Sequence, residues 1–484
     1  MDQITVRGKR FVDDQGRERI FRGVNFPMGK TDPPTLEEPF FAQCKALGFN
    51  ILRLGPCWSK LEPERPGQYD QAYLKIIDDI FDLSAKYGVY VFLDMHQDLW
   101  SDFGVGVGDG APAWATLDEG HGYTKPKKIW AEGYFWGRGV HAAFDNFWNN
   151  TPVHGKGLQD HFAALWQMLA RRYGGHPAFF GFDFLNEPHP GALGGRIFRT
   201  LAANLVHTLA FSPGVGRRQA LKALLCGGNT HEALDILTPG VLHKVTRTAE
   251  GLMRKFDTGY YQPFIARMAG AVREVTSKGV IFMEHSYFCN IGVPFSASPP
   301  AGETQACYSP HAYDFLVDGP LYDHASDTRA GFFFEESARA QRRLHLPVLV
   351  GEWGSAGTLK DKECDYGWFR HIEFLQDFFD AQGWSNTYWA YWHGLFDYGN
   401  FTAVLSRPYP VTVNGVLEKF QVSLSAKTCT LWYTPSPAPL RLPTEIYLPR
   451  GFERVDAGKG AKVTMKDDIL RVITKSPKIV VRYK

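Results

Sequence analysis

Two short stretches of the chain, DFLNEP at residues 183–188 and LVGEWG at residues 349–354, share one pattern. Each is a run of mostly apolar residues, as in a buried strand, and each leads to a carboxylate, Glu187 in the first and Glu352 in the second. A buried carboxylate costs several kcal/mol unless it is paired or used in chemistry. Each of these two glutamates must therefore either pair with a neighbouring residue or take part in a reaction.

Eight runs of apolar, β-branched or aromatic residues before residue 400 have the character of strands buried on both faces. They are residues 19–26, 50–56, 89–96, 179–188, 279–285, 306–314, 347–354 and 386–392. Helical patterns at 36–48, 72–88 and 158–175 lie between them, and each ends on a glycine, which favours a left-handed helix cap. Strands that alternate with helices predict a (β/α)8 TIM barrel, with a doubly wound open sheet as the alternative.

Polar residues in or just after the carboxyl half of these strands favour the barrel. They are Arg53, His96, Asp98, Asn186, Glu187, His311, Tyr313 and Glu352. A barrel collects such residues from many strands at one face, whereas an open sheet gathers them at a switch point between two strands. Five of the predicted strands contribute here, so we expect one active face at the carboxyl end of a barrel.

The predicted domains are a barrel over residues 1–400 and an antiparallel β-sandwich over residues 401–484, where polar and apolar residues alternate without helical period. Two connections of the barrel are too long to be plain loops, at about 97–157 and 189–260. The first is rich in aromatic residues: Trp100, Phe103, Trp114, Trp130, Tyr134, Phe135, Trp136, Phe144, Phe147 and Trp148. Such side chains either pack the insertion onto the barrel or contact lipid at a membrane surface.

Composition excludes several classes of partner. The chain has 53 Lys and Arg against 51 Asp and Glu, so a nucleic-acid partner is not expected. The 16 histidines show no tight ligand spacing, and we expect no metal or other cofactor. No apolar run approaches the roughly 18 residues of a membrane span. The first residues do not have the pattern of a signal peptide, so we expect a protein that is either secreted with its leader removed or cytoplasmic. We also expect a monomer.

Two carboxylates that face one another across a barrel mouth are the groups that glycoside hydrolysis requires. In a retaining enzyme they stand about 5–5.5 Å apart, and their mutual repulsion keeps one of them protonated near neutral pH. We expect that member to be Glu187, with Asn186 beside it to bind a sugar hydroxyl. Tyr313 and Arg53 would hold Glu352 ionised. The alternative is a purely structural buried pair of Arg53 and Glu352.

The motifs LNEP and GEWG after the fourth and seventh strands, with LRL on the second and DMHQD on the third, resemble glycoside hydrolase family 5. Within that family the chain is similar to the endoglycoceramidases and their relatives. The stretches that carry this likeness are LDMHQDLWSD (93–102), APAWAT (111–116), NEPHPG (186–191), SPHAYD (309–314) and RPYP (407–410). The resemblance implies a (β/α)8 barrel that acts by the retaining mechanism.

The resemblance also implies the roles of individual residues. Glu187 would be the acid/base and Glu352 the nucleophile. A pocket for the first sugar would be formed by Lys30, His96, Asp98, Asn186, Tyr313 and Trp389. The 189–260 insertion departs from the family patterns, so the resemblance gives no expectation for the preferred lipid.

The implied activity is hydrolysis of the β-glycosidic bond between a glycan and ceramide in glycosphingolipids, with transient contact at a membrane or micelle. An exo-acting β-glucosidase on glucosylceramide or steryl glucosides is the main alternative. A non-catalytic carbohydrate-binding barrel would be expected to lack one of the two glutamates. A cellulase-like endoglucanase fits poorly with the aromatic insertions and the C-terminal β domain.

Overall fold

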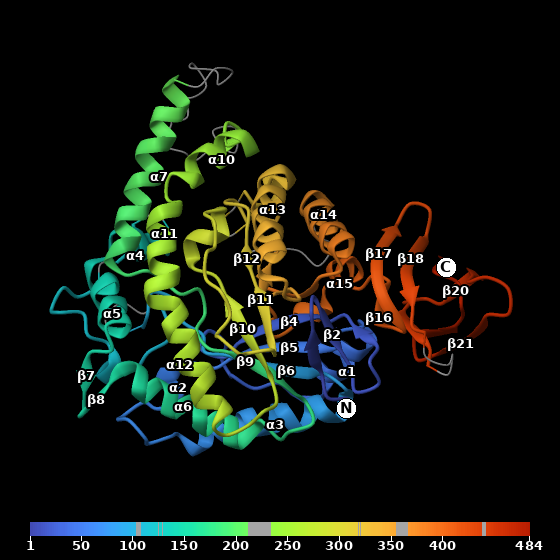
Figure 1. Cartoon of the computed structure of the whole chain (residues 1–484), viewed down its shortest axis with the longest axis horizontal. Coiled ribbons are helices and arrows are strands. Elements are labelled where there is room, and N and C mark those ends of the chain that lie inside the picture. The colour runs from blue at the N-terminus through green and yellow to red at the C-terminus, as the bar shows by residue number, and fades with distance from the viewer. Residues whose placement is uncertain are drawn as a thin grey trace.

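The computed structural model describes residues 1–102, 108–123, 125–127, 129–211, 234–317, 319, 321–354, 366–437 and 442–484 (Figure 1). Its centre is a sheet of eight parallel strands, and each of the eight predicted strands is present in it. They are β4 (Arg22–Pro27), β5 (Ile51–Gly55), β6 (Tyr90–Asp94), β9 (Phe179–Asp183), β10 (Val280–Glu284), β11 (Ala306–Ser309), β13 (Leu349–Val350) and β15 (Ser385–Tyr388). The strands from β4 to β11 follow one another in sequence order, β15 pairs with the other edge of β4, and β13 pairs with β15.

The barrel closes between β11 and β13. A parallel bridge joins Tyr308 to Val348, and the short strands β12 (His311–Ala312) and β14 (Glu352–Trp353) then pair in parallel. His311 and Glu352 stand opposite one another in that pair. The predicted (β/α)8 barrel is therefore confirmed, and the open-sheet alternative is wrong.

Helices surround the strands, and the three predicted segments are helical. Gly88 caps the helix that precedes β6 with φ of 75°, the left-handed conformation that favours glycine. The barrel helices are α1 (Glu38–Ala46), α2 (Trp58–Leu61), α3 (Gln71–Tyr87), α6 (Leu158–Tyr173), α12 (Gln262–Arg273), α13 (Asp327–Leu344), α14 (Tyr366–Gln382) and α15 (Gly399–Leu405).

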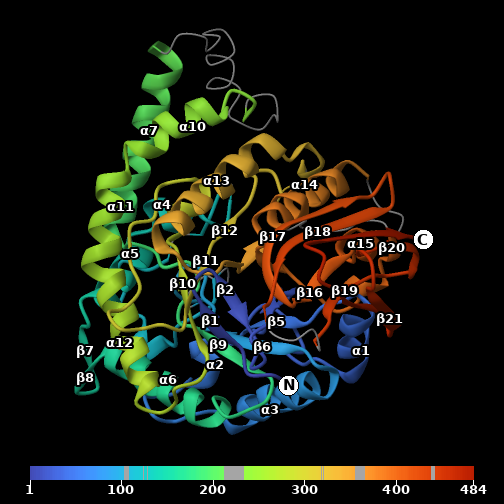
Figure 2. The same ribbon diagram turned by 45° about the vertical axis from the view of Figure 1, so that its right-hand side comes forward.

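The two expected insertions add further elements on one side of the barrel. The first contains α4 (Glu132–Trp136), α5 (Arg138–Trp148) and the hairpin β7 (Pro152–Val153) and β8 (Lys156–Gly157). The second contains α7 (Ala192–Phe211), α10 (Pro239–Arg247) and α11 (Glu250–Phe256), and a π-helix (Asp257–Tyr261) joins it to α12. Figures 1 and 2 show α7 and α10 extending beyond the barrel. Phe103 and residues 212–233 lie outside the described part of the insertions.

The barrel interior changes from apolar to charged along β5, β6 and β10. Ile51, Phe92 and Phe282 belong to an apolar cluster at the amino-terminal end, where residues of β1 (Thr5–Arg7) and β2 (Arg10–Val12) also pack. Two residues further along the same strands stand Arg53, Asp94 and Glu284. Side chains alternate between the two faces of a strand, so these charged residues face the barrel interior as the apolar ones do. The apolar layer thus supports a charged layer at the carboxyl end.

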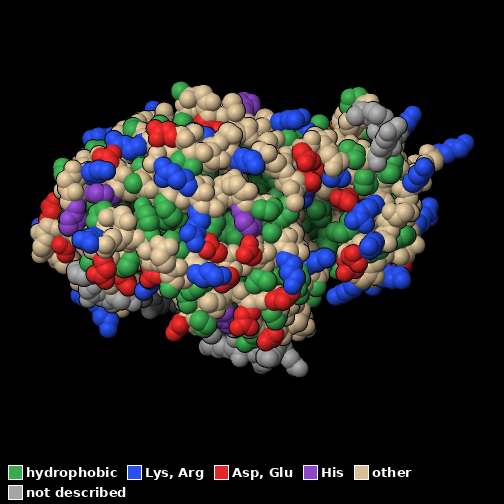
Figure 3. Space-filling view, turned by 90° about the horizontal axis from the view of Figure 1, so that it is seen from below, with side chains coloured by type: hydrophobic (Ala, Val, Ile, Leu, Met, Phe, Trp, Pro, Cys, Tyr) green, Lys and Arg blue, Asp and Glu red, His purple; other side chains and the backbone are tan. Residues whose placement is uncertain are grey.

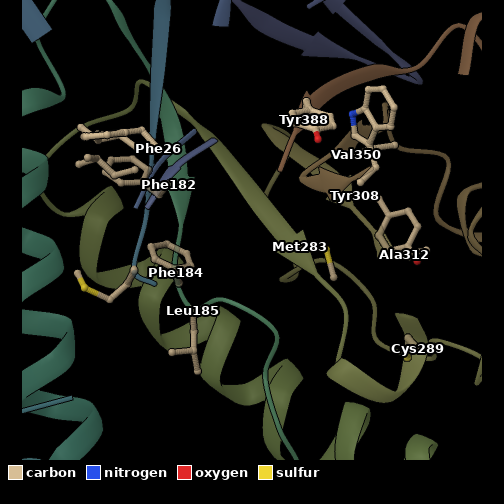
Figure 4. Close-up of a cluster of buried hydrophobic side chains, with 14 of the residues drawn as sticks. Phe26, Phe182, Phe184, Leu185, Met283, Cys289, Tyr308, Ala312, Val350 and Tyr388 are labelled. Atoms are coloured by element: carbon tan, nitrogen blue, oxygen red, sulfur yellow. The ribbon is translucent and has the colours of Figure 1, made fainter. Parts of the chain in front are cut away.

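The outward-facing residues of the same strands pack under the helices. Figure 4 shows part of this core, with Phe26, Phe182, Met283, Tyr308, Val350 and Tyr388 coming from six different barrel strands. These side chains are at most 3% exposed. Burial on both faces explains why the strands read as nearly continuous apolar runs. None of the helices in the described parts of the chain is long and apolar enough to cross a membrane.

The C-terminal region forms two packed antiparallel sheets, as predicted. One contains β17 (Gly415–Ser423), β18 (Thr428–Pro435), β23 (Lys478–Tyr483) and β20 (Phe452–Asp456). The other contains β16 (Tyr409–Val413), β19 (Thr444–Tyr447), β22 (Ile469–Ile473) and β21 (Lys462–Lys466), and it continues through β3 (Glu18–Arg19) into β2 and β1. The first strands of the chain therefore extend the C-terminal sheet instead of belonging to the barrel, and the first barrel strand begins at Arg22 and not at residue 19.

Charge is unevenly distributed between the two regions. Residues 401–484 contain 14 Lys and Arg against 6 Asp and Glu, whereas residues 1–400 contain 39 against 45. Figure 3 shows Lys and Arg side chains around the C-terminal domain, at the right of that view. The small net charge of the whole chain therefore hides an acidic barrel and a basic C-terminal domain.

Candidate active site

All ten residues that the sequence analysis assigned to the site lie at the carboxyl end of the barrel. Lys30 follows β4, Arg53 lies on β5, His96 and Asp98 follow β6, Asn186 and Glu187 follow β9, His311 lies on β12, Tyr313 follows it, Glu352 lies on β14, and Trp389 follows β15. The parallel strands bring residues separated by more than 300 positions in the chain to one face.

Glu352 is held as a carboxylate. Its Oε1 accepts a hydrogen bond from Arg53 Nη1 at 2.6 Å, and its Oε2 accepts one from the Tyr313 hydroxyl at 2.7 Å. Burial by itself would raise the pKa of Glu352, but the nearby His311 and Arg53 outweigh burial and lower that pKa to about 2. The side chain is therefore ionised at neutral pH and points a negative charge into the barrel mouth.

Glu187 has the opposite character. Burial is the main cause that raises its pKa to about 7, and the negative charge of Glu352 adds to the shift. Its Oε1 accepts a hydrogen bond from Asn290 Nδ2 at 2.5 Å and lies 3.1 Å from His311 Nδ1. The backbone of Glu187 has φ of 40°, in the left-handed region that costs energy for a residue with a side chain. This carboxyl group is thus poised to hold or release a proton near neutral pH.

The distance between the two acids fits one reaction class. One oxygen of Glu187 and one of Glu352 lie within 4.8 Å of each other, with a nitrogen of His311 equally near. Retaining glycosidases place their carboxyl groups about 5–5.5 Å apart, whereas inverting enzymes leave about 6.5–9.5 Å for a water molecule. The pair therefore has the spacing for attack by one carboxylate and proton transfer by the other.

Arg53 occupies the centre of the charged layer. Its Nη2 lies 3.1 Å from Asp94, 3.1 Å from Asp183 and 3.3 Å from Glu284, in addition to the Nη1 contact with Glu352. All of these side chains are buried. Arg53 is consequently not in an isolated pair with Glu352, which was the structural alternative from the sequence; it sits among four carboxylates.

A second cluster lies beside the two glutamates and contains the residues expected to bind the first sugar. The rings of His96 and Trp389 stack with centroids 5.0 Å apart, and the Lys30 ammonium lies 5.4 Å from the Trp389 centroid and contacts Asp98. Burial acts to lower the pKa of His96, but Asp94 and Asp109 raise it to about 9. An aromatic face edged by charged hydrogen-bonding groups suits a sugar ring.

Asn186 is oriented by Arg53 and by the backbone of Gln97. Its Oδ1 accepts a hydrogen bond from Arg53 Nη2 at 3.0 Å, and its Nδ2 donates to the Gln97 carbonyl at 3.0 Å. The amide is therefore fixed beside Glu187, with a second N–H on Nδ2 for a substrate hydroxyl.

Five further residues of the site were missed in the sequence analysis: Asp94, Asp109, Asp183, Glu284 and Asn290. Asp94, Asp183 and Glu284 each end a barrel strand, so the reasoning applied to Glu187 and Glu352 would also have found them. Asn290 lies in a 3-10 helix after β10 (Tyr287–Ile291), and only the fold brings it to Glu187. Both Asp109 carboxylate oxygens are buried without a hydrogen-bond partner, near Lys30 and His96.

Three groups of carboxylates and imidazoles are compact enough to be compared with metal sites. In the group of Asp94, Asp183 and Glu284, the Arg53 guanidinium already supplies the positive charge. In the group of His96, Asp98 and Asp109, the ammonium of Lys30 does so. The third group consists of Glu187, His311 and Glu352. The first two groups therefore fit a side-chain cation better than a bound ion.

The sequence profile described as cellulase (glycosyl hydrolase family 5) matches residues 12–209 and 257–394, and that of the glycoside hydrolase family 5 C-terminal domain matches residues 407–482. The chain belongs to glycosyl hydrolase family 5. Glu187 and Glu352 lie within the matched parts of the family 5 barrel.

This family 5 chain is 34% identical over 219 residues to the endoglycoceramidase of Cyanea nozakii, an alignment that covers 39% of the chain and 42% of that relative. It is 26% identical over 255 residues to a glucosylceramidase of Cryptococcus neoformans var. grubii, covering 40% and 34%. The structure of endo-glycoceramidase II from Rhodococcus sp. in complex with ganglioside GM3 is similar with a TM-score of 0.72 and 25% identity, over 98% of this chain and 99% of that one. The matched region is thus less than half the length of the curated relatives.

Proposed function

We propose that this family 5 chain is a retaining glycosidase that cleaves the β-glycosidic bond between a glycan and ceramide in glycosphingolipids. The observation that carries the proposal is the spacing of the Glu187 and Glu352 oxygens within 4.8 Å, combined with pKa values of about 7 and about 2. An acid that is protonated near neutral pH and a carboxylate that is ionised stand on either side of the bond to be broken.

The reaction has two steps. In the first, Glu352 attacks the anomeric carbon, the bond to the lipid oxygen breaks, and Glu187 gives its proton to that oxygen. In the second, Glu187 takes a proton from a water molecule, whose oxygen displaces Glu352 from the anomeric carbon. Two inversions at one carbon return the sugar with its original configuration. Asn186 and the cluster of Lys30, Asp98 and Trp389 hold the first sugar during both steps.

The lipid substrate is supported by similarity, since the relatives include an endoglycoceramidase and a structure solved with ganglioside GM3. The test is to incubate the protein with glucosylceramide, galactosylceramide, lactosylceramide, a ganglioside and a steryl glucoside, and to identify the released glycans by mass. Release of intact oligosaccharide from the ganglioside supports the proposal. Absence of cleavage of every glycolipid, with a folded protein, contradicts it.

The similarity to a fungal glucosylceramidase favours a second candidate, an exo-acting β-glucosidase on glucosylceramide or steryl glucosides. The same set of substrates separates the two. An exo-enzyme releases glucose from glucosylceramide or the steryl glucoside and leaves the ganglioside uncut.

We also propose that the first insertion contacts the membrane or micelle that holds the lipid. Half of its described aromatic residues are buried, including Trp100, Tyr134 and Phe147, and these pack the insertion onto the barrel. Trp130 and Trp136, however, are 38% and 53% exposed. Trp136→Ser should lower hydrolysis of glycolipid in vesicles and leave hydrolysis of a soluble aryl glycoside unchanged. Equal rates for both proteins on both substrates would contradict this contact.

A further inference from the structure

A third glutamate, Glu284, lies behind the catalytic pair at the end of β10 and is 1% exposed. Its Oε2 accepts a hydrogen bond from the backbone N–H of Glu187 at 3.0 Å. Its Oε1 lies 2.5 Å from His311 Nε2, in an ion-pair contact that departs from hydrogen-bond alignment. One buried carboxyl group therefore touches both the backbone of the acid/base residue and the imidazole beside it.

The other nitrogen of the His311 ring contacts Glu187. This nitrogen, Nδ1, lies 3.1 Å from Glu187 Oε1, the same oxygen that accepts from Asn290 Nδ2. We place the hydrogen of His311 on Nδ1, so that Glu187 Oε1 accepts from both this nitrogen and Asn290 Nδ2. The acid proton of Glu187 then belongs on Oε2.

The buried charges require one more proton in this region. Asp94, Asp183, Glu284 and Glu352 surround Arg53 at contacts of 2.6–3.3 Å, and His96 is a second cation, 2.7 Å from Asp94, so four carboxyl groups face two cations. An uncompensated buried negative charge is costly, and a proton shared by a carboxyl group and an imidazole relieves it. The short contact between Glu284 and His311 is where the geometry accommodates that proton. The titratable and charged groups that face Glu284 are Arg53, Asp94, Asp183, Glu187, Tyr261, His311 and Glu352.

We propose that Glu284 is a positioning residue for the acid/base step: with a proton held between its Oε1 and His311 Nε2, it keeps His311 Nδ1–H directed at Glu187 and fixes the left-handed backbone of Glu187. The proton stays between Oε1 and Nε2 throughout, and no bond to substrate is made by Glu284. The inference rests on the proposed function, because it concerns how Glu187 is aligned. It agrees with the pKa of Glu284, which burial and the charge of Asp183 raise well above the usual range.

The test compares Glu284→Leu and Glu284→Gln on two β-glycosides that differ only in their leaving groups. Glu284→Leu removes the contacts with the Glu187 N–H and with His311, together with the 3.3 Å contact to Arg53. The kcat for a glycoside with a poor leaving group should fall about a hundredfold, at the lower end of what general acid catalysis contributes. The first step with a dinitrophenyl glycoside needs no proton and should keep its rate. Glu284→Gln retains an acceptor for the Glu187 N–H and a donor for His311 Nε2, and it should restore most of the activity.

Two further measurements distinguish a positioning role of Glu284 from a general loss of structure in the variant. The hydrogen bond from His311 lowers the pKa of Glu187, so its loss in Glu284→Leu should move the alkaline limb of kcat/KM to higher pH. Nitrogen-15 NMR of labelled histidine should show His311 with its hydrogen on Nδ1 in the wild type and a mixture of tautomers in Glu284→Leu. The matched control is Glu62→Leu, which removes another glutamate that is 1% exposed but contacts Trp58 and Gly67. That control should lower Tm without changing the dependence on the leaving group.

Equal loss on both glycosides in Glu284→Leu, with an unchanged alkaline limb and tautomer, would overturn the inference and leave Glu284 a structural residue. Unchanged kinetics on both would also overturn it. If the wild-type protein cleaves no β-glycoside at all, the proposed function fails instead, and the NMR measurement still decides the tautomer of His311.

Discussion

Glu187, which follows β9, and Glu352, which lies on β14, both stand at the mouth of one barrel, but their surroundings shift their pKa values in opposite directions. Around Glu352 stand Arg53, the Tyr313 hydroxyl and His311, and its pKa falls to about 2. Around Glu187 burial dominates, its partners meet only one of its two oxygens, and its pKa rises to about 7. Strand position therefore supplies the pair of glutamates, whereas residues from neighbouring strands set the pKa of each one.

The largest effect is expected when the ionised member is removed. Glu352→Gly should lower hydrolysis by a factor on the order of 10⁶, as loss of a catalytic nucleophile can. The space left by the side chain should accept fluoride, so a glycosyl fluoride of opposite anomeric configuration should be transferred to a lipid acceptor. Product analysis by mass spectrometry checks both outcomes. Ordinary hydrolysis of glycolipid by this variant would remove Glu352 from the nucleophile role.

A smaller and selective effect is expected at the protonated member. Glu187→Gln should slow hydrolysis of glycolipid by roughly 10²–10⁴, the usual contribution of general acid–base catalysis. Aryl glycosides with good leaving groups should still form the glycosyl-enzyme, and added azide should speed its turnover because azide attacks without a base. Stopped-flow and steady-state rates measure the two steps. The assignment is wrong if Glu187→Gln and Glu352→Gln behave alike on an activated substrate.

The pH dependence of the rate tests the difference between the pKa values of Glu187 and Glu352 without a mutation. Activity needs Glu187 protonated, and its pKa is about 7, so kcat/KM should fall about tenfold per pH unit above that value. Activity also needs Glu352 ionised, and with a pKa of about 2 no acidic limb from this residue should appear in the mildly acidic range. Rates from acidic to alkaline pH are measured with a soluble glycoside that has a poor leaving group, because only such a leaving group needs the proton of Glu187. An acidic limb near the ordinary pKa of glutamate, not caused by unfolding, would contradict the environment described for Glu352.

The smallest effect is expected when Glu352 loses only one of its two hydrogen bonds. Tyr313→Phe removes the 2.7 Å hydrogen bond to Glu352 Oε2, and the bond from Arg53 remains. A hydrogen bond to a charged group contributes about 1.5–3 kcal/mol, so kcat should fall by at least about tenfold while KM changes little. The rate of glycosyl-enzyme formation with a dinitrophenyl glycoside checks this step alone. Unchanged formation in Tyr313→Phe would show that Arg53 is sufficient to hold the carboxylate.

The barrel and the position of Glu187 and Glu352 at its mouth were predictable because the evidence for them is local in sequence. A buried strand reads as a continuous apolar run, and Glu187 and Glu352 stand where such runs end. The charged network around Arg53, beneath the two glutamates, was harder to predict from the sequence. Asp94, Asp183 and Glu284 end strands in the same way, but their shared partner Arg53 becomes apparent only when the barrel closes.

Other features were beyond local patterns. Asn290 reaches Glu187 from a short helix after β10, and no spacing in the sequence indicates that contact. The pairing of β3 with β16 joins residues about 400 positions apart, so the first strands of the chain looked like part of the barrel. The net charge of +2 gave no sign that the C-terminal domain is basic and the barrel acidic.

The most direct test of the central claim is to trap the glycosyl-enzyme. The protein is incubated with a dinitrophenyl 2-deoxy-2-fluoro-β-glycoside, which slows the second step, and the digested protein is examined by mass spectrometry. The assignment of Glu352 as nucleophile and Glu187 as acid/base predicts one sugar per chain, attached to the peptide that contains Glu352 and absent from Glu352→Gln. Attachment to Glu187, or hydrolysis with inverted configuration and no attached sugar, would contradict it.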